Sequence, residues 1–355
     1  MTGASPRKPP RIYKDSAACD VFFIAGASQN MSQSDIPLGI DISKDTFHVA
    51  LLKGQKQSKY QQFDNTADGF AQLSQWLNRQ GVNHVHGCLE ATSIYGHALA
   101  TYLNQQGHRV SIVNPMRIKG YAKSQLARTK SDRADAKLIA QFCRDLKPAP
   151  WQPSEAEVMT LQAYTRRLDA LEQMLTQEKN RLKITPDELK ADIEDHIAFL
   201  KAQVTSVKKR LLEHIQTHDS LKTQHDLLTT IVGVGDSTAA RVLSEIGSIH
   251  HFSSARQLAA FAGVTPQEHE SGTSVRGKTR LCKIGNRRLR KALYFPALNL
   301  MRRCPQMHPF CERLLAAGKP KMQVVGAVMH KLMRVIFGVL KSAQPFDPDK
   351  LLAAA

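Results

Sequence analysis

The chain has 355 residues, 42% of them hydrophobic, which is enough for two domains with buried cores. Its 49 Lys and Arg against 31 Asp and Glu give a net charge of +18 and a pI near 9.7, which favour a polyanionic partner: nucleic acid first, with an anionic membrane surface as the alternative. No apolar run approaches the roughly 20 residues of a membrane span, and six cysteines without a CxxC pair or zinc-ligand spacing indicate reduced thiols of a cytosolic protein.

Residues 1–35 are rich in Pro, Ser, Lys and Arg, which predicts a disordered leader. The apolar patch at 21–27, which directly follows Asp20, is short for the core of a signal peptide. Met31 is an alternative start that would remove this patch, and the sequence leaves both starts open.

Residues 36–150 alternate between strand and helix patterns, which predicts an α/β unit. Strands are expected at 38–43, 46–53, 58–63, 82–90 and 109–113, with helices at 67–80 and 95–106. The strand–helix–strand unit is expected to stop at Asn114–Pro115. A further helix is expected within 127–140, with Ser131 as its N-cap.

Asp41 stands between Ile40 and Ile42 near the end of the first expected strand. An ionised carboxylate among strand hydrophobics is costly unless a cation or a metal ion compensates its charge. The alternative is that Asp41 starts the turn at 43–45 and faces water. This stretch alone does not decide between a metal ligand and a turn residue.

Three further carboxylates follow in the same unit. Glu90 ends a later strand, and Asp132 and Asp135 share one helix face, with Cβ atoms about 5–6 Å apart. Taken alone, the two helix acids fit solvated residues that favour the N-terminal end of the helix dipole. Together with Asp41, the three follow the layout by which an RNase H-like sheet gathers oxygen ligands for two Mg²⁺ ions, about 3.5–4 Å apart, in phosphoryl transfer.

Residues 151–225 switch to long helices. After Thr185–Pro186, apolar residues step by four and three from Leu189 to Leu211, which is a heptad-like stripe. The preceding helix carries its own apolar series, so an antiparallel helical hairpin and a self-associating coiled coil both fit. We interpret this segment as a spacer or oligomerisation arm without chemistry of its own.

The expected C-terminal unit, 226–348, begins with a helix that ends in Gly233-Val-Gly235 and a second helix from Asp236 or Ser237. This pattern is typical of a helix-hairpin-helix, whose glycine turn presents backbone N–H groups to a DNA phosphate. A tight turn used only for packing two helices is the alternative. Residues 349–355 are interpreted as a tail.

A basic stretch follows, because 276–291 holds eight Lys and Arg and no acid. Glycines and hydroxyl residues lie between the cations, which suits a phosphate site better than a simple solvated face. Ser271 is a candidate nucleophile toward a phosphodiester, since nearby cations would lower its pKa and stabilise the transition state; the alternative is a structural loop serine. The predicted nucleic-acid-binding residues are Gly233, Gly235, Arg276, Lys278, Arg280, Lys283, Arg287, Arg288, Arg290 and Lys291.

Several blocks together resemble one family. Gly-Ile-Asp-Ile-Ser-Lys at 39–44, Cys-Leu-Glu-Ala-Thr at 88–92 and Lys-Ser-Asp-Arg-Ala-Asp-Ala at 130–136 are similar to blocks of the DEDD transposases of the insertion-sequence-110 family, which are related to the Piv-type DNA invertases. Phe-Ala-Gly-Val-Thr-Pro at 261–266, Glu-Ser-Gly-Thr-Ser-Val-Arg-Gly at 270–277 and Gly-Asn-Arg-Arg-Leu-Arg at 285–290 resemble that family's C-terminal transposase domain. The resemblance covers about 36–348.

By that resemblance, Asp41, Glu90, Asp132 and Asp135 match a RuvC-like tetrad that binds Mg²⁺, and Ser271 matches a nucleophilic serine. The implied reaction is DNA cleavage and exchange through a covalent phosphoserine intermediate, at a composite site completed by a partner protomer. The family also implies a homodimer or homotetramer bridged by a coiled coil, double-stranded donor and target DNA, and a non-coding bridge RNA that supplies specificity. The implied location is the cytoplasm, in association with the nucleoid.

Two rival classes remain. A metal-dependent nuclease or Holliday-junction resolvase would use the same tetrad to activate water and would leave no protein–DNA adduct. A catalytically idle nucleic-acid-binding protein is disfavoured, because the tetrad and Ser271 are both intact. The sequence alone gives neither the bridge RNA, nor the target, nor the choice between insertion, excision and inversion.

Overall fold

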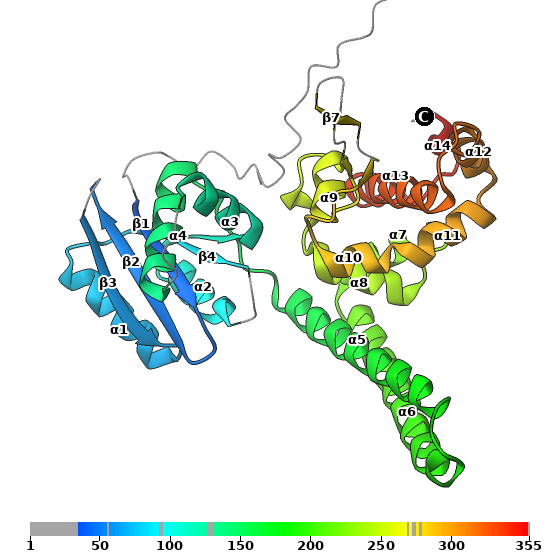
Figure 1. Cartoon of the computed structure of the whole chain (residues 1–355), viewed down its shortest axis with the longest axis horizontal. Helices are drawn as coiled ribbons and strands as arrows, with labels where there is room; N and C mark the ends of the chain where they lie inside the picture. Colours follow the sequence, from blue (N-terminus) through cyan, green and yellow to red (C-terminus); the bar gives the residue numbers. More distant parts are fainter. Residues whose placement is uncertain are drawn as a thin grey trace, which may run out of the picture.

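The computed structural model describes residues 35–54, 57–91, 95–126, 131–267, 270–271, 275–276 and 279–353. The predicted disordered leader lies outside the described residues, apart from Asp35. The described chain forms a sheet unit, a long helical hairpin and a mainly helical C-terminal unit (Figure 1). The predicted combination of an α/β part and an α part is confirmed at this level.

Five strands form one mixed sheet in the order β3-β2-β1-β4-β5. β2 pairs antiparallel with β1 and β3, whereas β4 pairs parallel with β1 and β5. The strands are β1 Ile36–Ile42, β2 Thr46–Lys53, β3 Gln57–Asp64, β4 Val85–Glu90 and β5 Arg109–Val113. All five predicted strands are confirmed, although β4 begins at Val85 rather than at residue 82.

Helices cover both faces of the sheet (Figure 1), and they are α1 Ala67–Arg79, α2 Gly96–Gln105, α3 Pro115–Ser124 and α4 Asp132–Leu146. Side chains alternate along a strand, so Leu38 and Ile40 of β1 enter a core shared with α1 and α2. Gly39 and Asp41 therefore lie on the opposite face, which α4 covers. The strand period thus assigns Asp41 to the α4 side of the sheet.

α4 lies directly on β1 at Gly39. A Cβ atom added there would stand 2.1 Å from the carbonyl oxygen of Ala136 and 2.2 Å from the backbone nitrogen of Ala140. Both alanines are fully buried at this contact. The close approach of the two backbones brings the first turn of α4 within electrostatic range of Asp41.

The predicted strand–helix–strand unit, β4-α2-β5, ends at Val113 as expected, and Asn114 and Pro115 begin helix α3, which was not predicted. The Asn114 side chain accepts a hydrogen bond from the Met116 backbone N–H at 2.9 Å, which caps the helix. Pro115 occupies the first helical position, where its missing N–H costs nothing and its fixed φ suits the helix. The predicted N-cap of α4 is confirmed, since Ser131 accepts from the Ala134 N–H at 3.3 Å.

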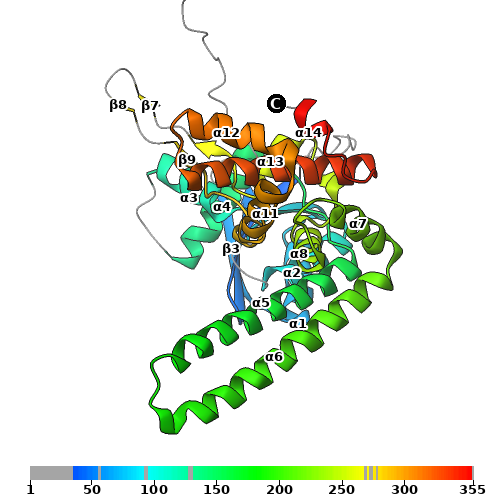
Figure 2. The ribbon, with the colours of Figure 1, turned by 90° about the vertical axis from the view of Figure 1, so that its right-hand side faces the viewer.

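The segment 151–225 forms a helical hairpin. α5 Ala156–Leu182 and α6 Asp187–Gln216 pack along each other (Figure 2), and α7 Asp219–Thr229 follows. Their interface buries an apolar row made of Leu168, Leu171, Leu200, Val204 and Val207. Of the two predicted alternatives, this chain therefore adopts the hairpin within one molecule.

The C-terminal unit packs short helices around one long helix, α13 Lys321–Ser342. The others are α8 Asp236–Ile246, α9 Ala255–Phe261, α10 Arg287–Ala292, α11 Tyr294–Arg303, α12 His308–Ala316 and α14 Lys350–Ala353, with 3₁₀ turns at Ile249–His251 and Pro305–Met307. Two small antiparallel pairs complete it: β6 Pro266–Gln267 with β9 Arg280–Leu281, and β7 Glu270–Ser271 with β8 Val275–Arg276.

α13 corrects the expectation that no apolar run is long enough for a membrane span. Its 22 residues reach the required length and a mean hydropathy of 1.4, which no other helix among the described residues does. However, 61% of its apolar window is buried inside the protein, where it packs against α7, α9 and α11. We therefore assign α13 as the core helix of the C-terminal unit.

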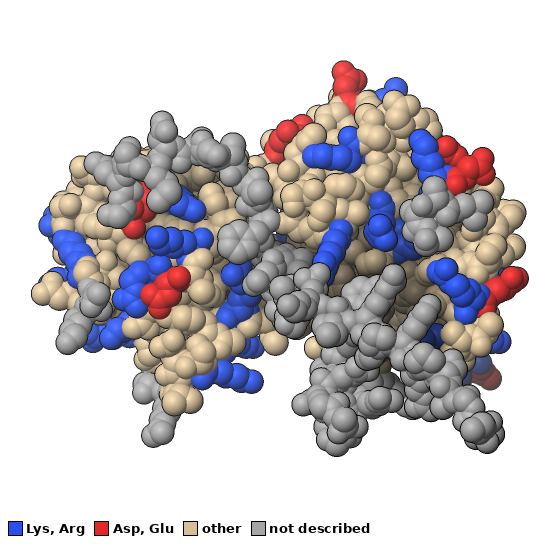
Figure 3. Space-filling model, turned by 90° about the horizontal axis from the view of Figure 1, so that it is seen from above, with Lys and Arg blue, Asp and Glu red and all other residues tan. Residues whose placement is uncertain are grey.

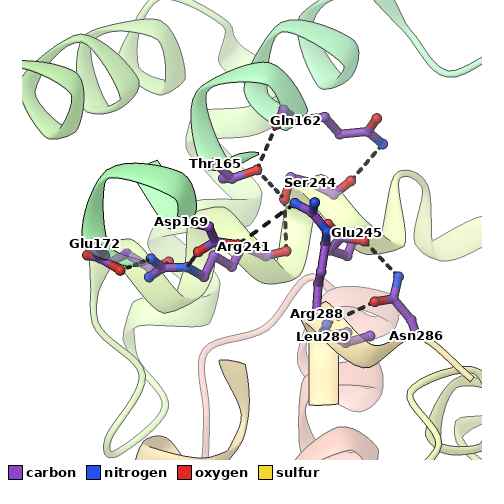
Figure 4. A network of polar contacts seen from close by, with 11 residues as sticks. Gln162, Thr165, Asp169, Glu172, Arg241, Ser244, Glu245, Asn286, Arg288 and Leu289 are labelled. Atoms are coloured by element: carbon purple, nitrogen blue, oxygen red, sulfur yellow. Dashed lines mark hydrogen bonds and ion pairs between the residues drawn. The ribbon is translucent and has the colours of Figure 1, made fainter. Parts of the chain in front are cut away.

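A polar network joins the hairpin to the C-terminal unit (Figure 4). Arg241 of α8 donates to Asp169 Oδ1 at 3.0 Å and to Glu172 Oε2 at 2.7 Å, both on α5. Nearby, Gln162 Nε2 donates to the Ser244 carbonyl oxygen at 2.8 Å. Because Arg241 and its partners are largely shielded from water, these bonds fix the base of the hairpin to α8.

Candidate metal and DNA-processing site

Asp41 is half-buried near the end of β1, directly opposite His48 of β2 in the antiparallel register. It lies within the strand, and the following turn closes through a hydrogen bond from Ser43 N–H to the Thr46 carbonyl oxygen at 2.9 Å. Burial raises the pKa of Asp41, and the charges of Asp135 and Asp132 raise it further. The carboxylate therefore occupies a position where its negative charge lacks full compensation.

Glu90 is the half-buried last residue of β4. Since β1 and β4 are parallel neighbours, the carboxyl ends of both strands lie at the same edge of the sheet. Burial raises the pKa of Glu90, and Asp41 and Asp135 raise it further, while Lys119 of α3 opposes the rise. Glu90 and Asp41 thus belong to one electrostatic cluster.

Asp132 and Asp135 lie in the first turn of α4, as the sequence predicts. Asp132 is 67% exposed, and its Oδ2 lies 3.2 Å from Nε2 of His48, whose side chain is only 12% exposed. Asp135 is less exposed than Asp132 and acts on both strand carboxylates. The structure therefore brings Asp41 into electrostatic range of each of the other three predicted acids, and Glu90 into range of Asp41 and Asp135.

The donor chemistry of this cluster fits a hard divalent cation. Four carboxylates supply only oxygen donors, and their mutual repulsion is relieved when a cation lies between them. Within the described ranges, however, no three His, Cys, Asp or Glu side chains stand close enough together to form a ready-made metal shell. Binding an ion would thus require the four side chains to draw together.

Three residues beside the acids were not predicted from the sequence: His48, Tyr60 and Lys119. His48 had a readable signal, because a two-residue turn at 44–45 places it opposite Asp41 in a hairpin. Lys119 had none, because it lies on α3, the helix that was not predicted. Tyr60 depends on the pairing of β2 with β3, which the sequence does not fix.

Of the predicted phosphate-binding residues, five basic residues are exposed at the surface of the C-terminal unit: Arg280, Lys283, Arg287, Arg288 and Lys291. Figure 3 shows Lys and Arg spread over both halves of one face of the molecule. Exposed cations of this kind supply sequence-independent affinity for phosphates. These five positions are compatible with the prediction.

Two of the predicted phosphate ligands contact other parts of the protein. Arg290 is partly buried, which lowers its pKa, and its guanidinium donates to the Lys283 carbonyl oxygen at 3.2 Å. Arg288 lies 3.8 Å from Asp169 of α5, beside Arg241 (Figure 4). Both side chains thus have structural partners, and the basic run is not a uniform phosphate surface.

The predicted glycine turn lies between α7 and α8. Gly233 has φ +90°, and a Cβ atom there would stand 2.8 Å from the Pro296 carbonyl oxygen of α11. Packing against α11 therefore accounts for Gly233. Gly235, the N-cap of α8, has no such neighbour within 4 Å among the described residues, so its backbone is open to a ligand.

Ser271 and Arg276 lie in the paired strands β7 and β8, where Ser271 is opposite Val275. The structure describes their backbones, and Lys278 lies outside the described residues. β7 is drawn above the C-terminal unit in Figure 1, apart from β1, β4 and α4. The chain does not bring Ser271 together with the four acids.

A carboxylate cluster on one unit and exposed cations on another are features of a metal-dependent nucleic-acid enzyme. Residues 38–189 match the family model described as DEDD transposase of IS110 type, and residues 225–312 match the model of the IS116/IS110/IS902 transposase family. The chain is 32% identical over 313 residues to the pilin gene-inverting proteins of Moraxella bovis and Moraxella lacunata, covering 87% of this chain and 97% of each relative.

The chain is also 26% identical over 303 residues to the transposase for insertion sequence element IS1111A of Coxiella burnetii, covering 76% of this chain and 79% of the relative. The chain belongs to the IS110 family of transposases. The predicted family and enzyme class are therefore confirmed. Membership implies DNA as substrate and indicates dependence on a divalent metal in a soluble cytoplasmic protein.

Proposed function

We propose that this chain is a Mg²⁺-dependent DNA recombinase that cleaves and exchanges strands through a covalent phosphoserine. The observation that carries the proposal is the cluster of Asp41, Glu90, Asp132 and Asp135 at one end of the sheet, with raised pKa values at Asp41 and Glu90. Clustered carboxylates repel one another, which destabilises the fold unless a bound cation offsets their charge. A site of this kind is therefore expected in an enzyme that binds cations. Membership of the IS110 family supports it.

The four acids would hold Mg²⁺, two ions in the arrangement of a RuvC-like domain. Bound there, the metal supplies charge stabilisation to the attacking and leaving phosphate oxygens. Lys119, which opposes the raised pKa of Glu90, balances part of the remaining charge. Gly39 lets α4 approach β1 closely enough for both helix acids to act on Asp41.

Ser271 is the proposed nucleophile. Its hydroxyl oxygen forms a bond to a DNA phosphorus and loses its proton, while one phosphorus–deoxyribose oxygen bond breaks and the released oxygen takes up a proton. The phosphoserine ester keeps the energy of the broken bond until a strand hydroxyl attacks it and restores the serine. Arg276 directly follows Val275, the residue paired with Ser271. It is the Lys or Arg nearest to Ser271 along the chain, and we propose that it holds the phosphate.

Because Ser271 and the acids lie on separate units, we propose that the working site is composite, with the acids supplied by a partner protomer. A non-coding bridge RNA is the proposed source of target specificity, and the charge of +18 supports simultaneous binding of RNA and two duplexes. Association with the nucleoid follows from the same charge. The relatives' names cover inversion and transposition, which share cleavage and exchange.

The hairpin is the proposed dimerisation element, acting as an intermolecular coiled coil at its far end. Apolar side chains are exposed there: Ile184 by 85%, Phe199 by 58% and Leu189 by 53%. Exposed apolar groups of this size favour a protein contact. Light scattering should show a dimer or tetramer that Ile184→Asp with Phe199→Asp reduces to monomer, whereas Phe295→Asp, at an exposed aromatic of α11, leaves it intact. A monomeric wild type would reject this role.

A strand-exchange assay with the bridge RNA and both DNA duplexes tests the proposed reaction. Ser271→Ala should lose exchange by at least a thousandfold yet still retain DNA and RNA, and EDTA should silence the wild type. A water-using nuclease would behave differently, since it would keep cleaving DNA after Ser271→Ala. Full exchange in EDTA would reject the metal role.

A further inference from the structure

His48 stands between the candidate metal site and the edge of the sheet. Its Nε2 lies 3.2 Å from Oδ2 of Asp132, and its Nδ1 lies 2.6 Å from the hydroxyl of Tyr60 on β3. The rings of His48 and Tyr60 also stack, with centroids 5.9 Å apart and planes 17° apart. His48 thus has a fixed partner on each ring nitrogen.

Tyr60 has a second contact with the same turn of α4. The guanidinium carbon of Arg133 lies 5.4 Å from the centroid of the Tyr60 ring, at a distance typical of a cation–π contact. Asp132 and Arg133 are adjacent, so neighbouring residues of α4 are held by the paired strands β2 and β3. We refer to His48, Tyr60 and Arg133 as the α4 clamp.

The Tyr60 hydroxyl is hydrogen-bonded to Nδ1 of His48, and Nε2 faces the Asp132 carboxylate as an ion-pair contact at 3.2 Å. Because a carboxylate oxygen only accepts, the ring form with its proton on Nε2 suits this contact. In the neutral ring Nδ1 is then an acceptor, and the Tyr60 hydroxyl donates to it. The Tyr60 hydroxyl is thus a suitable partner for the ring form whose Nε2–H faces Asp132.

We propose that the α4 clamp positions Asp132 for metal binding, with His48 and Tyr60 as positioning residues that act through that carboxylate. His48 engages Oδ2 and leaves Oδ1 available to an ion. Without the clamp, a carboxylate that is 67% exposed would sample several rotamers, and fixing it would cost binding free energy. The inference rests on the proposed metal role of the four acids.

The α4 clamp resembles the residues that surround and orient the ligands in metal sites generally. Groups that hydrogen-bond a ligating carboxylate orient it, and their loss typically weakens metal affinity about 10–100-fold. His48 contacts the proposed ligand Asp132 directly, whereas the Tyr60 hydroxyl reaches Asp132 only through His48. Loss of the Tyr60 hydroxyl should therefore fall at the lower end of this range and loss of His48 above it.

Mn²⁺ binding followed by electron paramagnetic resonance of the full chain tests the proposal without any catalytic readout. Tyr60→Phe keeps the ring, its stacking and the Arg133 contact, and removes only the hydroxyl. We expect its Mn²⁺ dissociation constant to rise about tenfold. His48→Ala should raise it further, and His48→Gln, whose amide N–H can still donate to Asp132, should recover part of the affinity.

Tyr102→Phe is the matched control. The Tyr102 hydroxyl makes a 2.9 Å hydrogen bond to Ser74 between α1 and α2, on the opposite face of the sheet. It should leave Mn²⁺ affinity unchanged, and thermal unfolding of each variant in EDTA separates loss of fold from loss of affinity. Wild-type affinity in Tyr60→Phe and His48→Ala would overturn the clamp while leaving the metal site in place. Absence of Mn²⁺ binding by the wild type would overturn the metal site itself, and the clamp with it.

Discussion

Ionising Asp41 and Glu90 costs more in the folded chain than in the unfolded chain, because burial and neighbouring carboxylates oppose their charge. At the residue scale, these two side chains are the clearest sign of function. A pair of ordinary surface acids would face water at little cost. In this fold, the ionisation of Asp41 and Glu90 remains unfavourable, which is expected where a bound cation offsets the charge.

Replacement of Asp41 by Asn should therefore stabilise the metal-free protein. The pKa of Asp41 is raised above its ordinary value of 3.8, so its contribution to stability is present below about pH 4 and is lost as pH rises through the raised folded pKa. At pH 7 in EDTA, Asp41→Asn should raise the melting temperature, by roughly 2–4 °C for each kcal/mol relieved. The gain should shrink toward pH 4.

The same variant should lose strand exchange, because Asn supplies one oxygen without charge. A melting curve across pH 4–8 measures the first effect and the exchange assay the second. A lower melting temperature at pH 7 in EDTA would mean that Asp41 has a stabilising partner, and would argue against an uncompensated site.

At the element scale, the placement of α4 on β1 decides the geometry of the site. The sequence predicts Ser131 as the helix start and the period of β1, so Asp41, Asp132 and Asp135 were predictable as candidate ligands. Their convergence depends on Gly39, whose lack of a Cβ lets the backbones of β1 and α4 meet. A single glycine in a strand does not indicate which helix packs against it, so this contact was not predictable from the sequence.

Gly39→Ala should destabilise the sheet unit, because its Cβ would stand within 2.2 Å of α4 backbone atoms. Overpacking of this kind costs about 1–3 kcal/mol, and urea unfolding measures it. Gly87→Ala on β4 is the control, since its Cβ would meet only ordinary contacts, the nearest at 3.5 Å. Equal stability of the two variants would contradict the direct packing of α4 on β1.

The α4 clamp and the basic stretch contain contacts that local sequence patterns do not predict. The position of His48 opposite Asp41 could be predicted from the length of the hairpin turn. Its hydrogen bond to Tyr60 also depends on the register of β3 against β2. Arg288 and Arg290 read as surface cations, yet each has partners from segments distant in sequence or from the folded loop beside it. Charge along the chain therefore does not distinguish a phosphate ligand from an internal ion pair or cap.

At the scale of the whole molecule, two units carry the two halves of the proposed chemistry. The family blocks along the sequence predicted both halves and implied a composite site, and the chain holds the two halves on separate units (Figure 1). The hairpin lies between them in sequence and is anchored to the C-terminal unit by Arg241. A composite site between protomers follows if Ser271 is the nucleophile.

The most direct measurement of the central claim is capture of the protein–DNA linkage. A DNA substrate with a nick or a blocked strand hydroxyl should trap the intermediate, and peptide mapping by mass spectrometry locates the modified residue. We expect a nucleotide joined through phosphate to Ser271, present with Mg²⁺ and absent in EDTA and in Ser271→Ala. Cleaved DNA without any linked peptide, or a linkage at another residue, would contradict it.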